Sequence, residues 1–338
     1  MRILFYLLAI TFSVVLMACS GRHDDTLKRI NQFLKERNFN QAVEILQQDL
    51  RQDPKDQSLL RMQVYIFLKS GQVDYAVAAY RKLQEIHPSD SILAKSLHDS
   101  DSVVRVASVK ALGLLRNEKS AEDLLSVVKD SEKNVRKAAI LALGDVGSAK
   151  AVPSLIEALH DESWFVRAEA ALALGKIGDG KAVQPLFTLL ETDRDSYVRE
   201  NVRKALGLLI SSTNQAPYKQ ALKSQKPEVA LTAALAFAEM KDTSGVGILL
   251  KNVDKAQSIE CVEIIKALTK LQSLDAIPHF KTALHHSDIS VRVHAILALG
   301  MMKDISSVET FKGYSSSQTE PAEIRLASAR ALNMIDQH

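Results

Sequence analysis

Four aspartates along the middle of the chain are each followed, six residues later, by an arginine. The pairs are Asp99 and Arg105, Asp130 and Arg136, Asp161 and Arg167, and Asp193 and Arg199. A carboxylate and a guanidinium at this spacing could form a catalytic series, or they could cap helices and share hydrogen bonds between neighbouring turns. Exposed pairs of this kind stabilise by about 0–1 kcal/mol each, so their repetition fits a device that sets register. We therefore predict a ladder of charged contacts between successive repeats and no catalytic residue among them.

Histidines supply the one local group of potential metal ligands in the sequence. They are His279, His285, His286 and His294. His285 occupies the same place in its repeat as His98 and His160, and neither a cysteine nor a close carboxylate completes a four-ligand zinc set. The sequence also lacks a nucleophile elbow, a phosphate-binding loop and a dinucleotide-binding glycine pattern. We predict no bound metal, no cofactor, no small-molecule substrate and no enzymatic activity.

The two cysteines of the chain have different surroundings. Cys261 falls inside an expected helix, where we predict a small, partly buried residue without a disulfide partner. Cys19 follows residues 1–18, in which one positive charge precedes an apolar run that is too short to span a membrane well. A segment of this kind is typical of an export signal.

Residues 16–19, Leu-Met-Ala-Cys, resemble the lipobox of bacterial lipoproteins. The resemblance implies cleavage before Cys19, acyl chains such as palmitate on that residue, and a short lipidated tether over residues 19–23. Ser20 stands where Asp would favour retention in the inner membrane, which implies an anchor in the outer membrane, facing the periplasm. An ordinary secretory signal that ends in Ala-Cys is the alternative.

The helices that carry the aspartates and arginines are repeated eight times with a period of about 31 residues. The second helix of each copy begins around one of the following positions: Val104, Val135, Val166, Val198, Val229, Glu260, Val291 and Ile324. A period of this length predicts a solenoid, because one helical hairpin cannot bury its apolar face without a neighbour. The fold we expect is therefore all-α, an α–α superhelix.

Val-Arg near the start of the second helix and Ala-Leu-Gly near its end resemble the HEAT repeat, specifically the short bacterial form found in phycobilin lyase subunits. The resemblance covers residues 92–336 and implies eight HEAT-like hairpins. Ala230 and Cys261 stand where Arg is expected in the fifth and sixth copies, and the matching aspartates are also missing. We predict that the ladder breaks there and that residues 215–265 form a bend or a softer joint.

Residues 24–91 carry a different helical period, of 34 residues. This interval separates Ala42 from Ala76 and Pro54 from Pro88. The pattern resembles two tetratricopeptide repeats, which are fewer than usually stand alone. We expect them to stack on the first HEAT-like helix as one continuous rod; a hinge near Pro88 is the alternative.

The composition argues against a nucleic-acid partner. The net charge is +3, and aromatic residues make up 5% of the chain. Basic residues are interleaved with acidic ones, so the sequence shows neither a basic footprint nor platforms on which bases could stack.

Leucines among charged residues on the second helices suit a surface for a protein partner, although the leucines alone could equally belong to the core. The single tryptophan could anchor such a partner at the edge of the solenoid. The candidate residues are Trp164, Glu169, Leu172, Asn201, Lys204, Leu235 and Lys266.

Together these features predict a lipid-anchored scaffold or adaptor that binds other proteins in the bacterial cell envelope, as an assembly factor of an envelope complex would. Two alternatives stay open. A lipoprotein that holds peptidoglycan or another glycan would need an aromatic-lined groove, and the chain is poor in aromatic residues. An enzyme subunit akin to phycobilin lyases would rest on the fold alone.

Overall fold

The computed structural model describes residues 24–211 and 214–336. The predicted signal peptide at 1–18, the tether and the lipidation of Cys19 lie outside these residues. Within the described ranges all regular secondary structure is helical, which confirms the all-α prediction. None of the helices in these ranges is both long and apolar enough to cross a bilayer.

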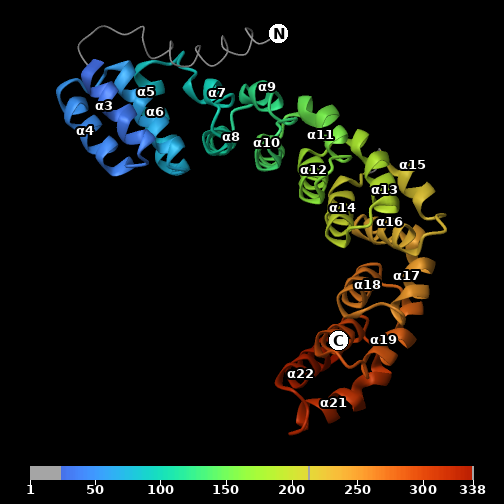
Figure 1. Cartoon of the computed structure of the whole chain (residues 1–338). Helices are drawn as coiled ribbons and strands as arrows, with labels where there is room; N and C mark the ends of the chain where they lie inside the picture. The colour runs from blue at the N-terminus through green and yellow to red at the C-terminus, as the bar shows by residue number, and fades with distance from the viewer. Residues whose placement is uncertain (1–23, 212–213, 337–338) are drawn as a thin grey trace. The chain divides into compact units, whose positions relative to one another are not determined.

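The chain divides into two compact units: unit 1 is Met1–Ile177 and unit 2 is Gly178–His338. In each unit the described helices form successive hairpins, and the second helices of the 31-residue hairpins lie along one side while the first helices lie along the other (Figure 1). Each unit is therefore a stack of α-hairpins, as the repeat predicts.

Unit 1 begins with two longer hairpins and continues with three of the shorter type. The helices are α3 (Asp24–Lys35), α4 (Phe39–Gln52), α5 (Gln57–Lys69), α6 (Val73–Ile86), α7 (Ile92–Ser96), α8 (Ser102–Leu115), α9 (Ser120–Leu125), α10 (Lys133–Val146), η1 (Ala149–Ala151), α11 (Val152–Ala158) and α12 (Trp164–Ile177).

Unit 2 contains five hairpins of the shorter type. Its helices are η2 (Gly180–Ala182), α13 (Val183–Thr192), α14 (Ser196–Leu209), α15 (Gln215–Ala221), α16 (Pro227–Glu239), η3 (Thr243–Gly245), α17 (Val246–Val253), α18 (Ser258–Lys270), η4 (Leu274–Ala276), α19 (Ile277–Ala283), α20 (Ile289–Met301), η5 (Ile305–Ser307), α21 (Val308–Ser316) and α22 (Ala322–Asp336). Together with the three in unit 1, these make the eight 31-residue hairpins that the sequence predicts.

Several second helices begin at an aspartate that caps the first turn. The carboxylate of Asp101 accepts a hydrogen bond of 2.9 Å from the amide of Val103, and Asp288 accepts one of 2.7 Å from Ser290. These bonds satisfy backbone donors that have no partner inside the helix. In these repeats the polar turn therefore fixes where the second helix starts.

The Ala-Leu-Gly motif allows neighbouring second helices to approach closely. A Cβ atom added at Gly144 would lie 2.9 Å from the Cβ of Ala173, and one added at Gly300 would lie 2.8 Å from that of Ala331. Real Cβ atoms do not approach so closely, so glycine is required at these two positions. The motif therefore sets the spacing between layers in both units.

Helix α5 is bonded to the turn before α7 and to the turn between α7 and α8. Asp90, whose side chain is fully buried, accepts hydrogen bonds from Arg61 and Gln57 of α5. Further along α5, the hydroxyl of Tyr65 donates to Asp99 at 3.1 Å and the ammonium of Lys69 lies 3.0 Å from Asp101. The two types of hairpin in unit 1 are thus stacked against each other, with α5 packed on α7 and α8.

Candidate functional site

The Asp and Arg residues of unit 1 form hydrogen-bonded links between successive hairpins. Arg105 donates from Nε and Nη2 to the two carboxylate oxygens of Asp130, both at 2.9 Å. Its Nη1 also donates to the backbone carbonyl of Asp99 at 2.8 Å. Arg105 therefore joins the turn of its own repeat to the carboxylate of the next repeat.

The next link repeats this geometry. Arg136 donates to Asp161 at 2.8 and 3.0 Å and to the carbonyl of Asp130 at 3.0 Å. Arg167 then donates to the carbonyl of Asp161 at 2.9 Å. Both groups of each bidentate pair are occupied by hydrogen bonds, so the pairs hold neighbouring turns rather than offering a base or an acid to a substrate.

The charge of these links is reflected in the titration of Asp130. Burial alone would raise its pKa, but the hydrogen bonds from Arg105 and from the amide of Glu132 favour the carboxylate, and the net effect lowers the pKa. The pKa of Arg105 is raised, chiefly by its hydrogen bond to Asp130. The pair is therefore ionised at neutral pH.

Unit 2 departs from this pattern in its middle hairpins. Arg199 still finds a carboxylate, because Glu228 of the next second helix lies 3.1 Å from its Nε. The predicted break is therefore wrong at this link. Ala230 and Cys261 offer no guanidinium, and the pattern returns at Arg292, whose Nη2 lies 2.6 Å from Glu320.

A long contact spans the interrupted part of the ladder. Arg203 of α14 donates to Glu263 of α18 at 2.9 Å, although α16 lies between these helices in the chain. The contact between Arg203 and Glu263 thus connects α14 directly with α18. The bend predicted for residues 215–265 stays a prediction.

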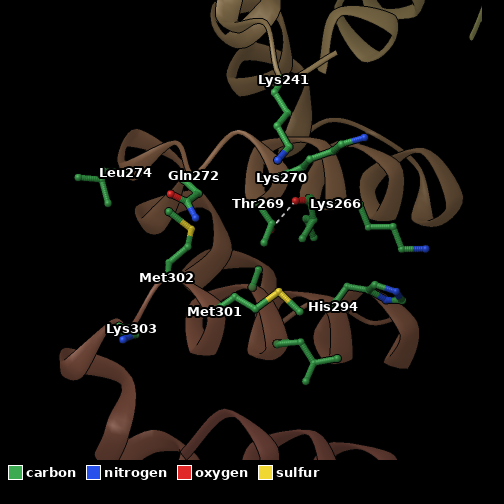
Figure 2. A pocket seen from close by; sticks show the side chains of 13 residues that line it. Lys241, Lys266, Thr269, Lys270, Gln272, Leu274, His294, Met301, Met302 and Lys303 are labelled. Atoms are coloured by element: carbon green, nitrogen blue, oxygen red, sulfur yellow. Dashed lines mark hydrogen bonds between the residues drawn. The ribbon is translucent and has the colours of Figure 1, made fainter. Parts of the chain in front are cut away.

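A groove opens on the surface of α18 and α20 in unit 2. Its volume is about 1030 Å³, and it is lined by the two helices and by the turns that follow α16, α18 and α20. Figure 2 shows Lys241, Lys266 and Lys270 on one side of the groove and Met301 and His294 on the other. The remaining side chains that matter for its chemistry are Leu274, Leu297, Met302 and Lys303.

Several apolar side chains are exposed in this groove. Leu274 is 69% exposed and Met301 is 58% exposed, and Leu297 and Met302 are half-buried beside them. The floor rests on the buried side chain of Ile265, which belongs to the core of unit 2. The groove is therefore apolar at its base and open to solvent above.

The rim of the groove is basic. Lys241, Lys266, Lys270 and Lys303 all line it, and no acidic residue is among its described lining residues. Within the part of the chain that the structure describes, Lys270 is the one of these four with an ion pair, at 2.7 Å from Glu239 outside the lining. The groove thus presents positive charge around an apolar floor.

Two of these lysines hold a backbone conformation that L-residues rarely adopt. The φ angles of Lys241 and Lys303 are +57° and +55°, and that of Gln272 between them is +51°. Gly147 has φ +73° in the corresponding turn after α10. Glycine adopts this conformation without a steric cost, whereas other residues lose about 1–2 kcal/mol. The groove therefore carries lysines at a turn position that glycine occupies after α10 and α12, and that Arg116 occupies after α8, also with a positive φ angle.

The predicted partner residues are distributed over both units. Lys266 is exposed and lines the groove, and Lys204 is exposed beside Glu200 at 3.4 Å. Leu172 and Leu235 are half-buried, and Leu235 packs against the core of unit 2. Of the seven candidate partner residues, Lys266 is the one that lines the groove.

Asn201 is not a surface residue. Its side chain is buried, and its amide donates to the carbonyl of Tyr197 at 2.9 Å, one turn earlier in α14. The prediction of a partner-binding role for Asn201 is therefore wrong, because its polar atoms are used within its own helix.

An aromatic cluster lies at the start of α12. The rings of Trp164 and Phe165 stack with centroids 3.4 Å apart, and both are partly exposed. The ammonium of Lys137 lies 4.8 Å from the Phe165 ring and 3.7 Å from Glu169. Trp164 and Glu169 thus belong to one small surface cluster of unit 1.

Three of the four histidines have separate side-chain contacts. His279 lies 2.7 Å from Asp254, the Nδ1 of His286 accepts from the amide of Asp288 at 2.9 Å, and His294 bonds the carbonyl of Ser290 at 2.7 Å. No three metal-binding side chains come together within the residues that the structure describes, His285 included. His294 instead contributes to the groove.

Cys261 is buried and donates from its thiol to the carbonyl of Val253 at 3.4 Å. Burial, followed by the charges of Asp254 and Glu260, raises the pKa of this thiol. A raised pKa keeps the group protonated at neutral pH, so Cys261 is unsuited to act as a nucleophile.

Sequence reasoning missed most of the groove. Lys241, Leu274, Met301 and Lys303 were not among the predicted partner residues. A signal was present in the turns, because Lys241 and Lys303 stand where two of the repeats have Gly147 and Gly178. Apolar residues at the ends of the second helices were the other signal.

Comparison with known proteins supports the repeat assignment. The model of the HEAT-repeat family matches residues 60–140, 89–164 and 121–207. The match starts inside α5, so it overlaps the region predicted to resemble tetratricopeptide repeats. Among curated proteins, none matches the sequence of this chain.

Solved structures of helical repeat proteins resemble this chain at low sequence identity. YibA of Escherichia coli is 18% identical, with a TM-score of 0.50 over 74% of this chain and 93% of that chain. An engineered protein is 20% identical, with a TM-score of 0.48 over 95% and 97% of the two chains. The complex of CpcE and CpcF of phycocyanin lyase from Nostoc is 20% identical, with a TM-score of 0.39 over 72% and 93%.

At such identities the likeness to YibA shows the fold alone. The matched family model and the described hairpins agree on the type of repeat. The chain is thus an all-helical repeat protein whose residues 60–207 match HEAT repeats.

Proposed function

We propose that this chain is a non-enzymatic scaffold that binds protein partners through the exposed surface of its second helices. The observation that carries the proposal is the groove on α18 and α20, where exposed apolar side chains lie beside lysines. Apolar groups open to solvent beside a polar rim are typical of protein–protein interaction sites. HEAT repeats and the stacked architecture are compatible with this role.

The cellular location in this proposal comes from the lipobox resemblance. The scaffold is anchored by lipid on Cys19 in the bacterial envelope, at the outer membrane and facing the periplasm. Several acyl chains give stable anchoring, because each buried methylene contributes about 0.8 kcal/mol. Its partners are then proteins of the envelope, such as the subunits of a complex that it helps to assemble.

In-cell photocrosslinking tests the scaffold. A photoreactive amino acid at Met301, inside the groove, should yield discrete crosslinked proteins. The same amino acid at Lys251, which is exposed on the first helix α17, should yield none of them. Equal crosslinking from both positions, or none from Met301, would contradict binding through this surface.

Metabolic labelling with a palmitate analogue tests the anchor separately. The wild-type chain should incorporate label and fractionate with membranes, and Cys19→Ser should do neither. An unlabelled wild-type chain would overturn the anchor and leave the scaffold standing, because the crosslinking experiment does not depend on lipid.

A further inference from the structure

We infer that the groove on α18 and α20 binds an acidic amphipathic helix of a partner protein. The inference rests on the proposed function and deepens it, because it assigns the chemistry of the bound segment. Three features of the groove support it: its apolar floor, its charge, and the nature of the elements that line it.

The floor requires an apolar stripe on the occupant. Leu274 and Met301 are largely exposed, and Leu297 and Met302 are half-buried, so covering them removes apolar surface from water. Methionine side chains adapt their shape to what they contact, which suits a groove that receives helical side chains of different sizes.

The rim requires negative charge on the flanks of that stripe. Among the described residues, Lys241, Lys266 and Lys303 form no ion pair, and with Lys270 they surround the floor with no described acidic residue in the lining. Opposite charge on the occupant steers its approach and disfavours basic partners. A helix with glutamates on both sides of an apolar stripe matches this distribution.

The lining determines the backbone conformation of the occupant. The groove is built from side chains of α18, α20 and three turns, and no strand edge lies among the described residues. An extended peptide would find no row of free backbone donors and acceptors to pair with. A helix satisfies its own backbone hydrogen bonds and needs from the groove only side-chain contacts. The surface is also hollowed, which fits a helix better than a flat membrane.

Fluorescence anisotropy with the purified full chain tests the inference. The probe is a labelled peptide of about 18 residues, in which leucines form one helical stripe flanked by glutamates. We expect binding that weakens as salt is added, and a loss of about tenfold or more in affinity for the double variant Lys266→Glu with Lys303→Glu. Met301→Glu should also weaken binding, because it places a charge on the floor.

Lys251→Glu is the control variant. Lys251 is exposed on the first helix α17, and it does not line the groove. Its variant should bind the peptide like the wild type. A reordered peptide of the same composition, with leucines spread around the helix, should bind at least about tenfold more weakly.

Several outcomes would overturn the inference. These are no binding at peptide concentrations up to about 1 mM, equal binding of the reordered peptide, or unchanged affinity in both groove variants. Binding of phosphatidylglycerol vesicles that the groove variants abolish, without binding of the peptide, would assign the groove to a membrane surface instead. Crosslinked partners at Met301 together with a peptide that fails to bind would leave the scaffold standing and reject the acidic helix.

Discussion

The two units are built from the same type of hairpin, but the residues in their turns make different contacts. In unit 1, Arg105 and Arg136 form bidentate pairs with the aspartates of the following repeat. In unit 2, the middle hairpins lack these arginines, and Lys241 and Lys303 occupy strained turns beside a groove. In unit 1 the repeating Arg and Asp side chains thus connect successive hairpins.

The difference indicates how a repeat protein separates stacking from binding. Positions that contact the next layer keep the repeat pattern, because each layer depends on its neighbour for stability. Positions whose residues depart from the repeat pattern and remain exposed, such as Lys241 and Met301, are available to contact a partner. Departures from the repeat on an exposed face are therefore the place to look for a binding site.

The largest effect is expected from removing a buried arginine of unit 1. In Arg136→Ala, Asp161 loses its bidentate partner, and both side chains are nearly buried, with exposures of 9% and 13%. Breaking such a pair leaves an uncompensated charge, so we expect a loss of about 3 kcal/mol in the free energy of unfolding. Urea unfolding, with hydrogen exchange read over α10 and α12, measures it.

Arg199→Ala is the matched variant in unit 2. Its pair with Glu228 is more open, with side-chain exposures of 27% and 39%, so the loss should be about 0–1 kcal/mol. Equal losses in the two variants would show that the Arg136–Asp161 pair of unit 1 stabilises the fold no more than the Arg199–Glu228 pair of unit 2.

A smaller effect is expected at the close contacts between neighbouring second helices, which occur in both units. In Gly300→Ala the new Cβ would lie 2.8 Å from Cα and Cβ of Ala331, so α20 and α22 must move apart, at a cost of about 1–3 kcal/mol. Gly144→Ala in unit 1 should behave alike, because its Cβ would meet Ala173 at 2.9 Å.

Gly207→Ala provides the control within a second helix of unit 2. No atom lies within 4 Å of its added Cβ, so the higher helix propensity of alanine should stabilise by up to about 1 kcal/mol. Thermal unfolding of the three variants distinguishes close packing from propensity. A destabilised Gly207→Ala would show that the helices tolerate alanine poorly for another reason.

Much of this architecture could be predicted from the sequence, and the reason is the repetition itself. The positions of Val104 and its equivalents placed eight second helices, and the spacing of Asp130 and Arg136 indicated a contact between turns. Which carboxylate each arginine would reach was harder to predict, because Arg199 uses Glu228 in place of the missing aspartate.

The groove could not be predicted in the same way. It depends on which side chains remain exposed after neighbouring helices pack, and Asn201 and Met301 show that the helical period alone does not decide this. Asn201 is buried by its neighbours, whereas Met301, near the end of its helix, remains 58% exposed.

Acid should weaken the links of unit 1 through Asp130. Its pKa is lowered in the folded chain, so its contribution to stability is present above the unfolded pKa and is lost as the pH falls through the folded pKa. The free energy of unfolding of the wild type should therefore decrease as the pH falls below about 4. In Asp130→Asn this decrease should be smaller, because the titrating group is gone. Urea midpoints measured from neutral pH down to acid compare the two, and parallel curves would show that the Asp130 link does not contribute to the acid response.

The smallest effect tests the strained turns, and the two units should respond alike in stability but differ in binding. In Lys303→Gly the turn loses a conformational strain of about 1–2 kcal/mol, and the added backbone freedom of glycine in the unfolded chain offsets about half of it. We expect a net gain of about 0.5–1 kcal/mol in thermal unfolding, together with weaker binding of the acidic peptide. Arg116→Gly, in the turn after α8 where φ is +48°, should show the same gain in stability with no change in peptide binding. If Lys303→Gly gains stability and binds as before, the lysine is not kept for the groove, and the strain at that turn has no part in recognition.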